Sequence, residues 1–417
     1  MAEDISAMAG LSLLDPKVQD SPFAAYRLMQ EKCPVYKMPE TGFYIVSRYD
    51  DVRAVAKDNE TFLNRIPARQ GLGGERDALY QSILKERGWP NAPTLNRCDG
   101  AVHARYRRLV ERVFTMKRVR DLTPEIDAMT NEIIDAFIDK GACDFNNEFA
   151  LMLPGMFISQ QLGLDRHAVR TLKKWGDAFV AMRSRVLSEE EVRATAEVEL
   201  ECQHHLAGVF EEKRRSPGQD ILSGLVHAHE AGEEPLSMEE LQGVAAQLIA
   251  AGFETTMNAI AHGMWFLLQA PAEMARLRAD RGLMKNFADE ALRFDTPVHG
   301  ILRFTSRDVE VAGTLIPKGS VVMPRYGAAN RDEAKFPDAD RFDAARPNAG
   351  QHLSFGFGAH YCVGAALARQ EIVSAFTALL DRLDDIKLAG PLPDPPHHPN
   401  FFLRPMKELR ITFRKIR

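Results

Sequence analysis

The sequence has few cysteines, and their spacing is not that of a disulfide-held protein. Its 417 residues contain five cysteines, and no two of them form a C-x-x-C pair. They are spread along the chain as Cys33, Cys98, Cys143, Cys202 and Cys362. An odd number of widely separated thiols excludes a disulfide framework and suits a reducing compartment. We therefore expect the protein in the cytoplasm.

The sequence also lacks an excess of positive charge, a leader signal and an unbroken apolar run. It has 53 basic and 58 acidic side chains and a formal net charge of -5, whereas nucleic-acid-binding proteins usually carry a basic footprint. The first residues are acidic where a signal peptide is basic. The longest apolar stretch, residues 244–268, is interrupted by Gln247, Glu254, Thr255, Thr256, Asn258 and His262. We expect neither nucleic-acid binding nor a membrane span.

Internal repeats, low-complexity tracts and Gly/Ser linkers are missing as well. The apolar fraction of 45% and charged fraction of 27% are ordinary for a globular protein, so extensive disorder is excluded. Nothing in the sequence forces a domain boundary. We expect one domain over residues 1–417, and a monomer.

The hydrophobic patterns predict a mainly α fold with a smaller β portion. A hairpin is expected over 35–46, and helices should follow one another over 103–280. Residues 62–98 are punctuated by proline and glycine and should be irregular. Ser237 and Glu240 form a capping-box pattern that should start a helix running to Gln269, about 48 Å long. Short strands should follow residue 293, before a last helix that begins near Cys362.

A glycine-dense segment surrounds Cys362. The stretch FGFGAHYCVG, residues 355–364, immediately precedes a helical pattern. Glycines allow tight turns and the close approach of a flat ligand, and a helix N-terminus favours a thiolate. A lone cysteine would usually be a buried residue in a turn. The spacing F-x-x-G-x-x-x-C-x-G, formed by Phe355, Gly358, Cys362 and Gly364, argues against that reading here.

A second polar segment interrupts the long apolar helix. The sequence AGFETT, residues 251–256, places a carboxylate and two hydroxyls among apolar residues. Such groups are costly to bury unless they are paired or used. A polar kink with a hydrogen-bonded Glu254 is the plain alternative, because hydroxyls can bond back to helix carbonyls and deform the helix.

Together these motifs, in this order, resemble the cytochrome P-450 family over almost the whole chain. The resemblance implies the cytochrome P-450 fold, a haem b (iron protoporphyrin IX) cofactor, and Cys362 as the proximal thiolate ligand of the iron. It implies that Phe355, Gly358 and Gly364 shape the haem-binding loop. Glu254 and Thr255 would be the acid–alcohol pair that governs proton delivery to bound dioxygen. Peroxide-using relatives lack this pair, which favours the use of O2 with electrons.

The resemblance also assigns charged residues elsewhere. Glu290 and Arg293 match the family's E-x-x-R ion pair, which supports the haem loop, and Arg341 is expected as its third partner. Cations suited to the two haem propionates are His103, Arg107, Arg303 and His360.

The expected partners are a redox protein and a hydrophobic small molecule. Residues 105–120 hold seven basic side chains against one acid, which is either a solvated helix face or a docking surface for an acidic partner. In the family this helix flanks the side where a ferredoxin or flavodoxin, reduced by its own reductase with NAD(P)H, delivers electrons.

The substrate is expected to be apolar, because the segments that line the family's pocket are mainly apolar. His299 could give one hydrogen bond, and a carboxylate could meet an arginine. The candidate arginines, for each of which a surface position is the more frequent alternative, are Arg65, Arg69, Arg183 and Arg185.

The resemblance implies a monooxygenase that hydroxylates or epoxidises its substrate with O2. A non-catalytic haem-thiolate sensor would leave Glu254 and Thr255 without a purpose. Oxidative coupling or C–C cleavage is an alternative within the family. A cysteine-nucleophile hydrolase lacks a persuasive base beside Cys362.

Overall fold

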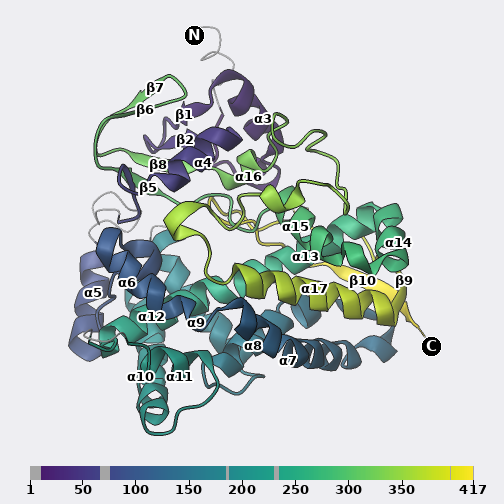
Figure 1. Ribbon diagram of the computed structural model, residues 1–417, viewed down its shortest axis with the longest axis horizontal. Coiled ribbons are helices and arrows are strands. Elements are labelled where there is room, and N and C mark those ends of the chain that lie inside the picture. The colour runs from purple at the N-terminus through teal and green to yellow at the C-terminus, as the bar shows by residue number, and fades with distance from the viewer. Residues whose placement is uncertain (1–10, 66–75, 185–186, 230–233, 395, 417) are drawn as a thin grey trace. The chain divides into compact units, whose positions relative to one another are not determined.

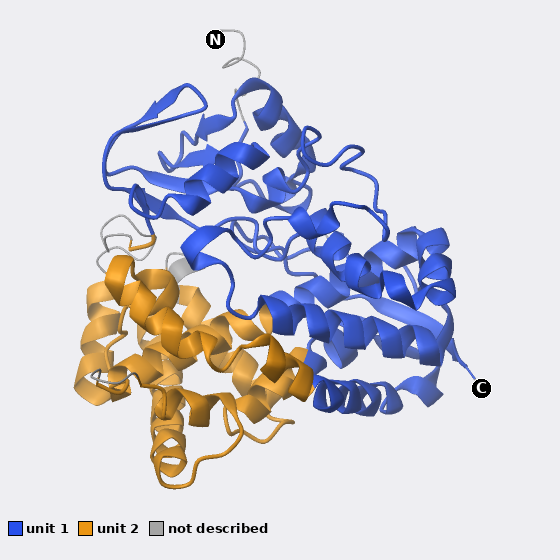
Figure 2. Ribbon diagram, in the orientation of Figure 1, with its two compact units in different colours: residues 1–63, 123–153, 255–417 blue, residues 64–122, 154–254 orange. Residues whose placement is uncertain are grey.

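The computed structural model describes residues 11–65, 76–184, 187–229, 234–394 and 396–416 (Figure 1). The chain forms two compact units, each built from separate stretches of sequence (Figure 2). Unit 1 comprises residues 1–63, 123–153 and 255–417, and unit 2 comprises residues 64–122 and 154–254. Helices predominate, with a smaller β portion, as the sequence predicted. The single domain over 1–417 stays a prediction.

A five-stranded sheet in unit 1 has the order β1-β2-β8-β5-β3. The predicted hairpin is confirmed: β1 and β2 are antiparallel, with Val35 opposite Val46. β2 runs parallel to β8, so the hairpin joins a segment far away in the sequence. The bounds of these strands are Val35–Lys37 (β1), Tyr44–Val46 (β2), Phe62–Leu63 (β3), Arg303–Thr305 (β5) and Val321–Pro324 (β8).

Two smaller sheets complete the β portion of unit 1. β10 lies between β4 and β9 in a three-stranded sheet, and β6 pairs with β7 in a separate hairpin. Their bounds are Ala142–Asp144 (β4), Val309–Val311 (β6), Thr314–Ile316 (β7), Leu383–Leu388 (β9) and Arg410–Lys415 (β10). The strand-rich region expected after residue 293 is thus confirmed.

The helices of unit 1 bury apolar faces against one another and against the large sheet. α15 packs on α17 through the rings of Phe287 and Phe376, whose centroids are 4.7 Å apart. Gly263 of α13 lets Phe376 approach closely, since a Cβ there would lie 2.9 Å from the ring. The bounds are Pro16–Asp20 (α2), Phe23–Lys32 (α3), Tyr49–Lys57 (α4), Glu254–Gln269 (α13), Pro271–Ala279 (α14), Met284–Phe294 (α15), Tyr326–Ala329 (α16) and Ala365–Arg382 (α17).

Unit 2 is helical in its described part. α10 begins with a capping box between Ser188 and Glu191, and it packs against α5, α9 and α12. Its helices are Arg76–Arg87 (α5), Gly100–Glu111 (α6), Met152–Gln161 (α8), Val169–Ser184 (α9), Glu189–Arg215 (α10), Ile221–Val226 (α11) and Met238–Gly252 (α12); α7 (Met116–Asp135) and α8 span the boundaries of the units.

The prediction that residues 62–98 are irregular is wrong for α5. This helix buries Tyr80 and Leu84, four residues apart on one face, against α10. The Tyr80 hydroxyl donates a hydrogen bond to the Glu199 carboxylate of α10. The flanking glycines and prolines concealed a short amphipathic helix. Two of the candidate arginines, Arg69 and Arg185, lie outside the described residues, as does the side chain of Arg183.

The prediction of one helix from Ser237 to Gln269 is also wrong, although its start is confirmed. Ser237 Oγ accepts from the Glu240 amide at 3.2 Å, and the Glu240 carboxylate accepts from the Ser237 amide at 2.8 Å. The helix then ends at Gly252, and α13 begins at Glu254 after the non-helical Phe253. A Cβ at Gly252 would lie 3.0 Å from Ile158 Cδ1, so a larger residue there would require the Ile158 side chain to shift. Among the described helices, none is long and apolar enough to cross a membrane.

Candidate functional site

The loop before α17 presents Cys362 at the surface of unit 1. The Cys362 side chain is exposed, and its amide donates to the Phe355 carbonyl at 2.8 Å, closing the loop on itself. Gly364 is the N-cap of α17. Gly358 has a φ of +75°, and a Cβ there would lie 3.0 Å from the Ala56 carbonyl oxygen of α4. Glycine is therefore required at this position for both conformation and space.

Side chains behind the loop hold it against α15 and α17. Arg369 stacks over the Phe355 ring at 4.5 Å and donates to Asp289 at 2.6 Å and to the Tyr361 hydroxyl at 3.1 Å. His352 contacts the same carboxylate at 3.2 Å. Burial alone would raise the pKa of Asp289, but the His352 hydrogen bond and the Arg369 charge outweigh it and lower the pKa. Asp289 is therefore an ionised anchor under the Cys362 loop.

The predicted ion pair between Glu290 and Arg293 is present and completely buried. Arg293 donates from Nε and Nη2 to the two carboxylate oxygens at 2.7 and 2.9 Å, a bidentate pair. The predicted third partner, Arg341, is wrong: its side chain is 68% exposed and pairs with Asp343. Arg346 takes this place, with Nε 3.1 Å from Glu290 Oε1.

Sequence reasoning also missed the connection from this ion pair to the cysteine loop. Arg293 donates to the Asn330 carbonyl at 2.9 Å. The Asn330 side chain accepts from the Leu353 amide at 2.7 Å and donates to Ser354 Oγ at 2.8 Å. Ser354 directly precedes Phe355, so buried hydrogen bonds run from α15 to the start of the loop. No local spacing signals Asn330, because its partners are distant in the sequence.

Glu254 and Thr255 lie at the break between α12 and α13, the first in unit 2 and the second in unit 1. Both side chains are half-buried. Burial raises the pKa of Glu254; Lys173 opposes this and Asp177 adds to it. Glu254 is thus a carboxyl group that keeps its proton to higher pH than an exposed glutamate.

Of the four predicted propionate-binding residues, two are in unit 1 and two are in unit 2. In unit 1, Arg303 is on β5, and His360 is the last residue of the short 3-10 helix Gly358–His360. In unit 2, His103 is buried on α6, and Arg107 follows one turn later and pairs with Glu111 at 2.5 Å. Binding of a propionate by Arg107 would therefore compete with this pair.

The expected substrate hydrogen bond from His299 is not supported. His299 is buried, with Nδ1 2.5 Å from the Tyr26 hydroxyl and Nε2 3.2 Å from Asp295 Oδ1. Both ring nitrogens are already engaged inside unit 1.

The residues of unit 1 fit a cysteine-ligated haem. An exposed sulfur in a glycine-rich loop is accessible to a metal ion. Arg303 is 3% exposed, its guanidinium donates to the Leu302 carbonyl at 3.1 Å, and within the described part of the chain no carboxylate pairs with it. A buried guanidinium of this kind is suited to an anionic group of a bound molecule.

Comparisons with known proteins agree with this geometry. The sequence model of the family described as cytochrome P450 matches residues 111–413. The chain is 34% identical to cytochrome P450 monooxygenase PikC of Streptomyces venezuelae, over 94% of this chain and 91% of that protein. It is 32% identical to 6-deoxyerythronolide B hydroxylase of Saccharopolyspora erythraea, over 88% and 89%. The structure of CYP108D1 from Novosphingobium aromaticivorans superposes with a TM-score of 0.86 at 29% identity, covering 100% of this chain and 99% of that one.

Proposed function

The chain belongs to the cytochrome P450 family, and on that premise we propose that it hydroxylates or epoxidises a hydrophobic small organic molecule. It is a monooxygenase of the oxidoreductase class, with haem b as cofactor. The observation that carries the proposal is the exposed Cys362 in a loop tied to α15 and α17 by polar contacts of Ser354 and Tyr361.

Cys362 would hold the cofactor through its sulfur, with Phe355, Gly358 and Gly364 shaping the loop around it. The cations Arg303, His360, His103 and Arg107 would bind the two propionates. Haem b, when bound, supplies the activation of dioxygen and the oxidation of the substrate. The buried Glu290–Arg293–Arg346 cluster acts through Asn330 to keep the loop in place.

Glu254 and Thr255 would manage the protons that the reaction consumes. The raised pKa of Glu254 lets its carboxyl keep a proton to higher pH than an exposed glutamate does. The neighbouring Thr255 hydroxyl can accept a hydrogen bond and donate one in turn. Together they would pass a proton toward the site where haem b would bind dioxygen.

Family members of bacterial origin take electrons from redox partners; for this chain the proposed donor is a ferredoxin or a flavodoxin, reduced with NAD(P)H by its reductase. Of the seven basic residues at 105–120, Arg105 pairs with Glu240 at 2.6 Å and Arg118 bonds the Gln219 carbonyl within unit 2. The exposed members are Arg108, Arg112, Lys117 and Arg120. Such a basic surface would mainly accelerate association with an acidic partner.

The proposed substrate is an apolar small molecule. The name of 6-deoxyerythronolide B hydroxylase says that this relative hydroxylates 6-deoxyerythronolide B. We extend to this chain only the general class, a hydrophobic organic compound. A cytoplasmic location and a monomeric state are part of the same proposal.

The first test is the absorbance spectrum of the purified protein, reduced with dithionite and exposed to carbon monoxide. A strongly red-shifted Soret band is expected for haem with a cysteinate ligand. C362S should lose this band. The control is C33S, which changes a cysteine outside the loop whose thiol bonds the Val35 carbonyl, and this variant should keep the band. No bound haem after supplementation, or an unchanged band in C362S, would overturn the assignment of Cys362. Oxygen consumption with surrogate redox partners then separates an enzyme from a non-catalytic sensor.

A further inference from the structure

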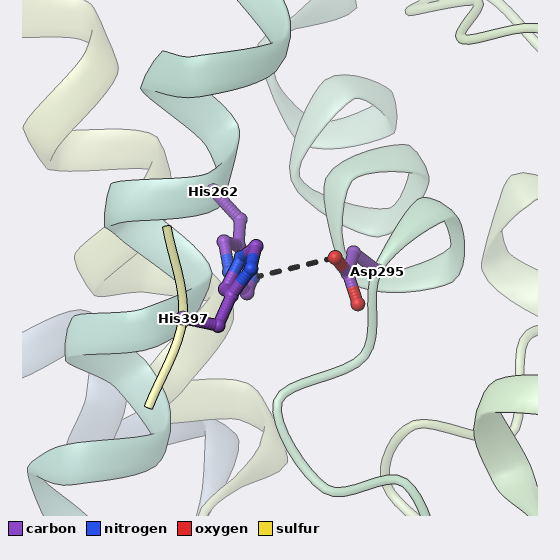
Figure 3. Close-up of side chains that lie close together, drawn as sticks. All are labelled: His262, Asp295 and His397. Carbon is purple, nitrogen blue, oxygen red and sulfur yellow. Dashed lines mark hydrogen bonds and ion pairs between the residues drawn. The ribbon is translucent and has the colours of Figure 1, made fainter. Parts of the chain in front are cut away.

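Three side chains of metal-ligating type converge in unit 1, away from the residues assigned above. His262 projects from α13, Asp295 follows α15, and His397 belongs to the segment between β9 and β10 (Figure 3). They are 1%, 3% and 3% exposed, respectively. One donor atom from each lies within 4.8 Å of the others. The proposed monooxygenase reaction gives none of them a role.

The two imidazole rings face each other through the same ring atom. Nε2 of His262 lies 3.3 Å from Nε2 of His397. Each ring has a carboxylate on its other side: His397 Nδ1 is 2.8 Å from Asp20 Oδ1, and His262 Nδ1 is 4.0 Å from Asp295 Oδ2. The carboxylates favour the hydrogen on Nδ1 of each ring, through a hydrogen bond in His397 and through electrostatic attraction alone in His262. Both Nε2 atoms then present lone pairs to each other, an arrangement that needs a positive centre between them.

A direct hydrogen bond between the rings explains the geometry less well. An N–H···N contact of 3.3 Å is longer than the usual protein hydrogen bond. Because His397 carries its hydrogen on Nδ1, toward Asp20, a direct bond would also require the hydrogen of His262 on Nε2. Nδ1, which has no hydrogen-bond partner among the described residues, would then present a lone pair to the Asp295 carboxylate. A buried acceptor facing a second acceptor is unfavourable.

The spacing suits two ligands of one metal ion. Two imidazole nitrogens bound at about 2.0–2.1 Å in a tetrahedral zinc site are separated by about 3.3–3.4 Å. Metal-ligating histidines commonly donate their other N–H to a carboxylate, as His397 can to Asp20.

The charges around the cluster leave room for a cation. Arg404 Nε is 2.7 Å from Asp295 Oδ2, so one positive charge opposes metal binding. Asp20 and Asp295 together contribute two negative charges. Two carboxylates therefore face the rings, against the one guanidinium, that of Arg404, which pairs directly with Asp295.

We propose that His262 and His397, assisted by Asp295, bind a zinc-type divalent metal ion that joins the C-terminal segment to α13. His262 and His397 are 135 residues apart in the sequence. An ion between them would link this segment to α13 and to the residues after α15, and would add its binding free energy to the stability of unit 1. This site is independent of the haem and of the proposed reaction.

The test measures zinc and iron by mass spectrometry in the purified, haem-loaded protein, expressed without a histidine tag. About one zinc per chain is expected, besides the haem iron, before or after incubation with Zn²⁺. H262Q and H397Q should each lose the zinc while keeping haem. The control is H227Q, which alters an exposed histidine whose Nε2 bonds the Lys213 carbonyl, and which should retain it.

Two further measurements on the wild-type protein keep the test decisive if a variant fails to fold. Adding Zn²⁺ to metal-depleted protein should raise its melting temperature, and EDTA should reverse the rise. Less than about a tenth of a zinc per chain after incubation, with no shift in melting temperature, would overturn the proposal and leave a histidine pair that shares a proton. Equal zinc in H262Q, H397Q and wild type would also overturn it, because the ion would then lie elsewhere.

Discussion

Arg346, rather than Arg341, is expected to stabilise the structure beneath the cysteine loop. Its guanidinium donates to Glu290 Oε1 at 3.1 Å and to the carbonyls of Pro337, Asp338 and Arg341 at 2.7, 2.9 and 2.8 Å. R346M would keep most of the side-chain volume but remove all four hydrogen bonds. Arg341 has an exposed guanidinium and supplies a carbonyl to the cluster, which R341M preserves.

The magnitude follows from burial. Removing one partner of a buried ion-pair network typically costs about 3–5 kcal/mol, because charges and carbonyls are left without partners. Arg293 and the Asp343 amide still bond Glu290, so R346M should fall near the lower end, at about 3 kcal/mol. R341M removes an exposed ion pair and should change the free energy of unfolding by less than about 1 kcal/mol.

The assay is denaturant unfolding of the two haem-loaded variants and the wild type, followed by helical circular dichroism and by the Soret band. R346M should unfold at lower denaturant and release haem earlier, whereas R341M should follow the wild type. Equal stability of R346M and wild type, or a larger loss in R341M, would refute the assignment of Arg346 as the third member of the cluster.

Three more predictions address protons, pH and electron transfer. T255A should bind haem normally and give the same carbon monoxide spectrum, but yield less product per NAD(P)H as electrons are diverted to peroxide or water; unchanged yield would count against the proton role. Glu371 of α17 is buried, and burial raises its pKa from 4.5 to about 8. The stability that its protonated form contributes is therefore full below about pH 4.5 and is lost as the pH rises toward 8. The melting temperature of E371Q should fall less over this pH range than that of the wild type, and equal falls would contradict the shifted pKa. Charge reversal by R112E with K117E should slow ferredoxin-supported turnover and weaken its salt dependence. The control R193E, which reverses an exposed charge on α10, should change neither.

Features governed by short sequence separations were predicted well. The β1–β2 hairpin, the capping box of Ser237 with Glu240, and the pairing of Glu290 with Arg293 all appear as expected. In each case the partners are close along the chain, so the period of the strand or helix places them together.

Features that depend on distant partners were predicted poorly. Arg341 and Arg346 lie in one short segment, and spacing could not show which of them turns inward to Glu290. Gly252, next to the break at Phe253, lies close to Ile158, and α5 packs against α10. These contacts join elements that are far apart in the sequence.

The sequence by itself determined the family, the cysteine loop and the order of its motifs, because glycine conformation, helix caps and one-turn ion pairs are local properties of the chain. Only the tertiary structure decided that Arg346 completes the buried cluster, that Asn330 carries its effect to the loop, and that His262 meets His397. Such meetings depend on the path of the whole backbone and on the burial that excludes water, and no short stretch of residues encodes either.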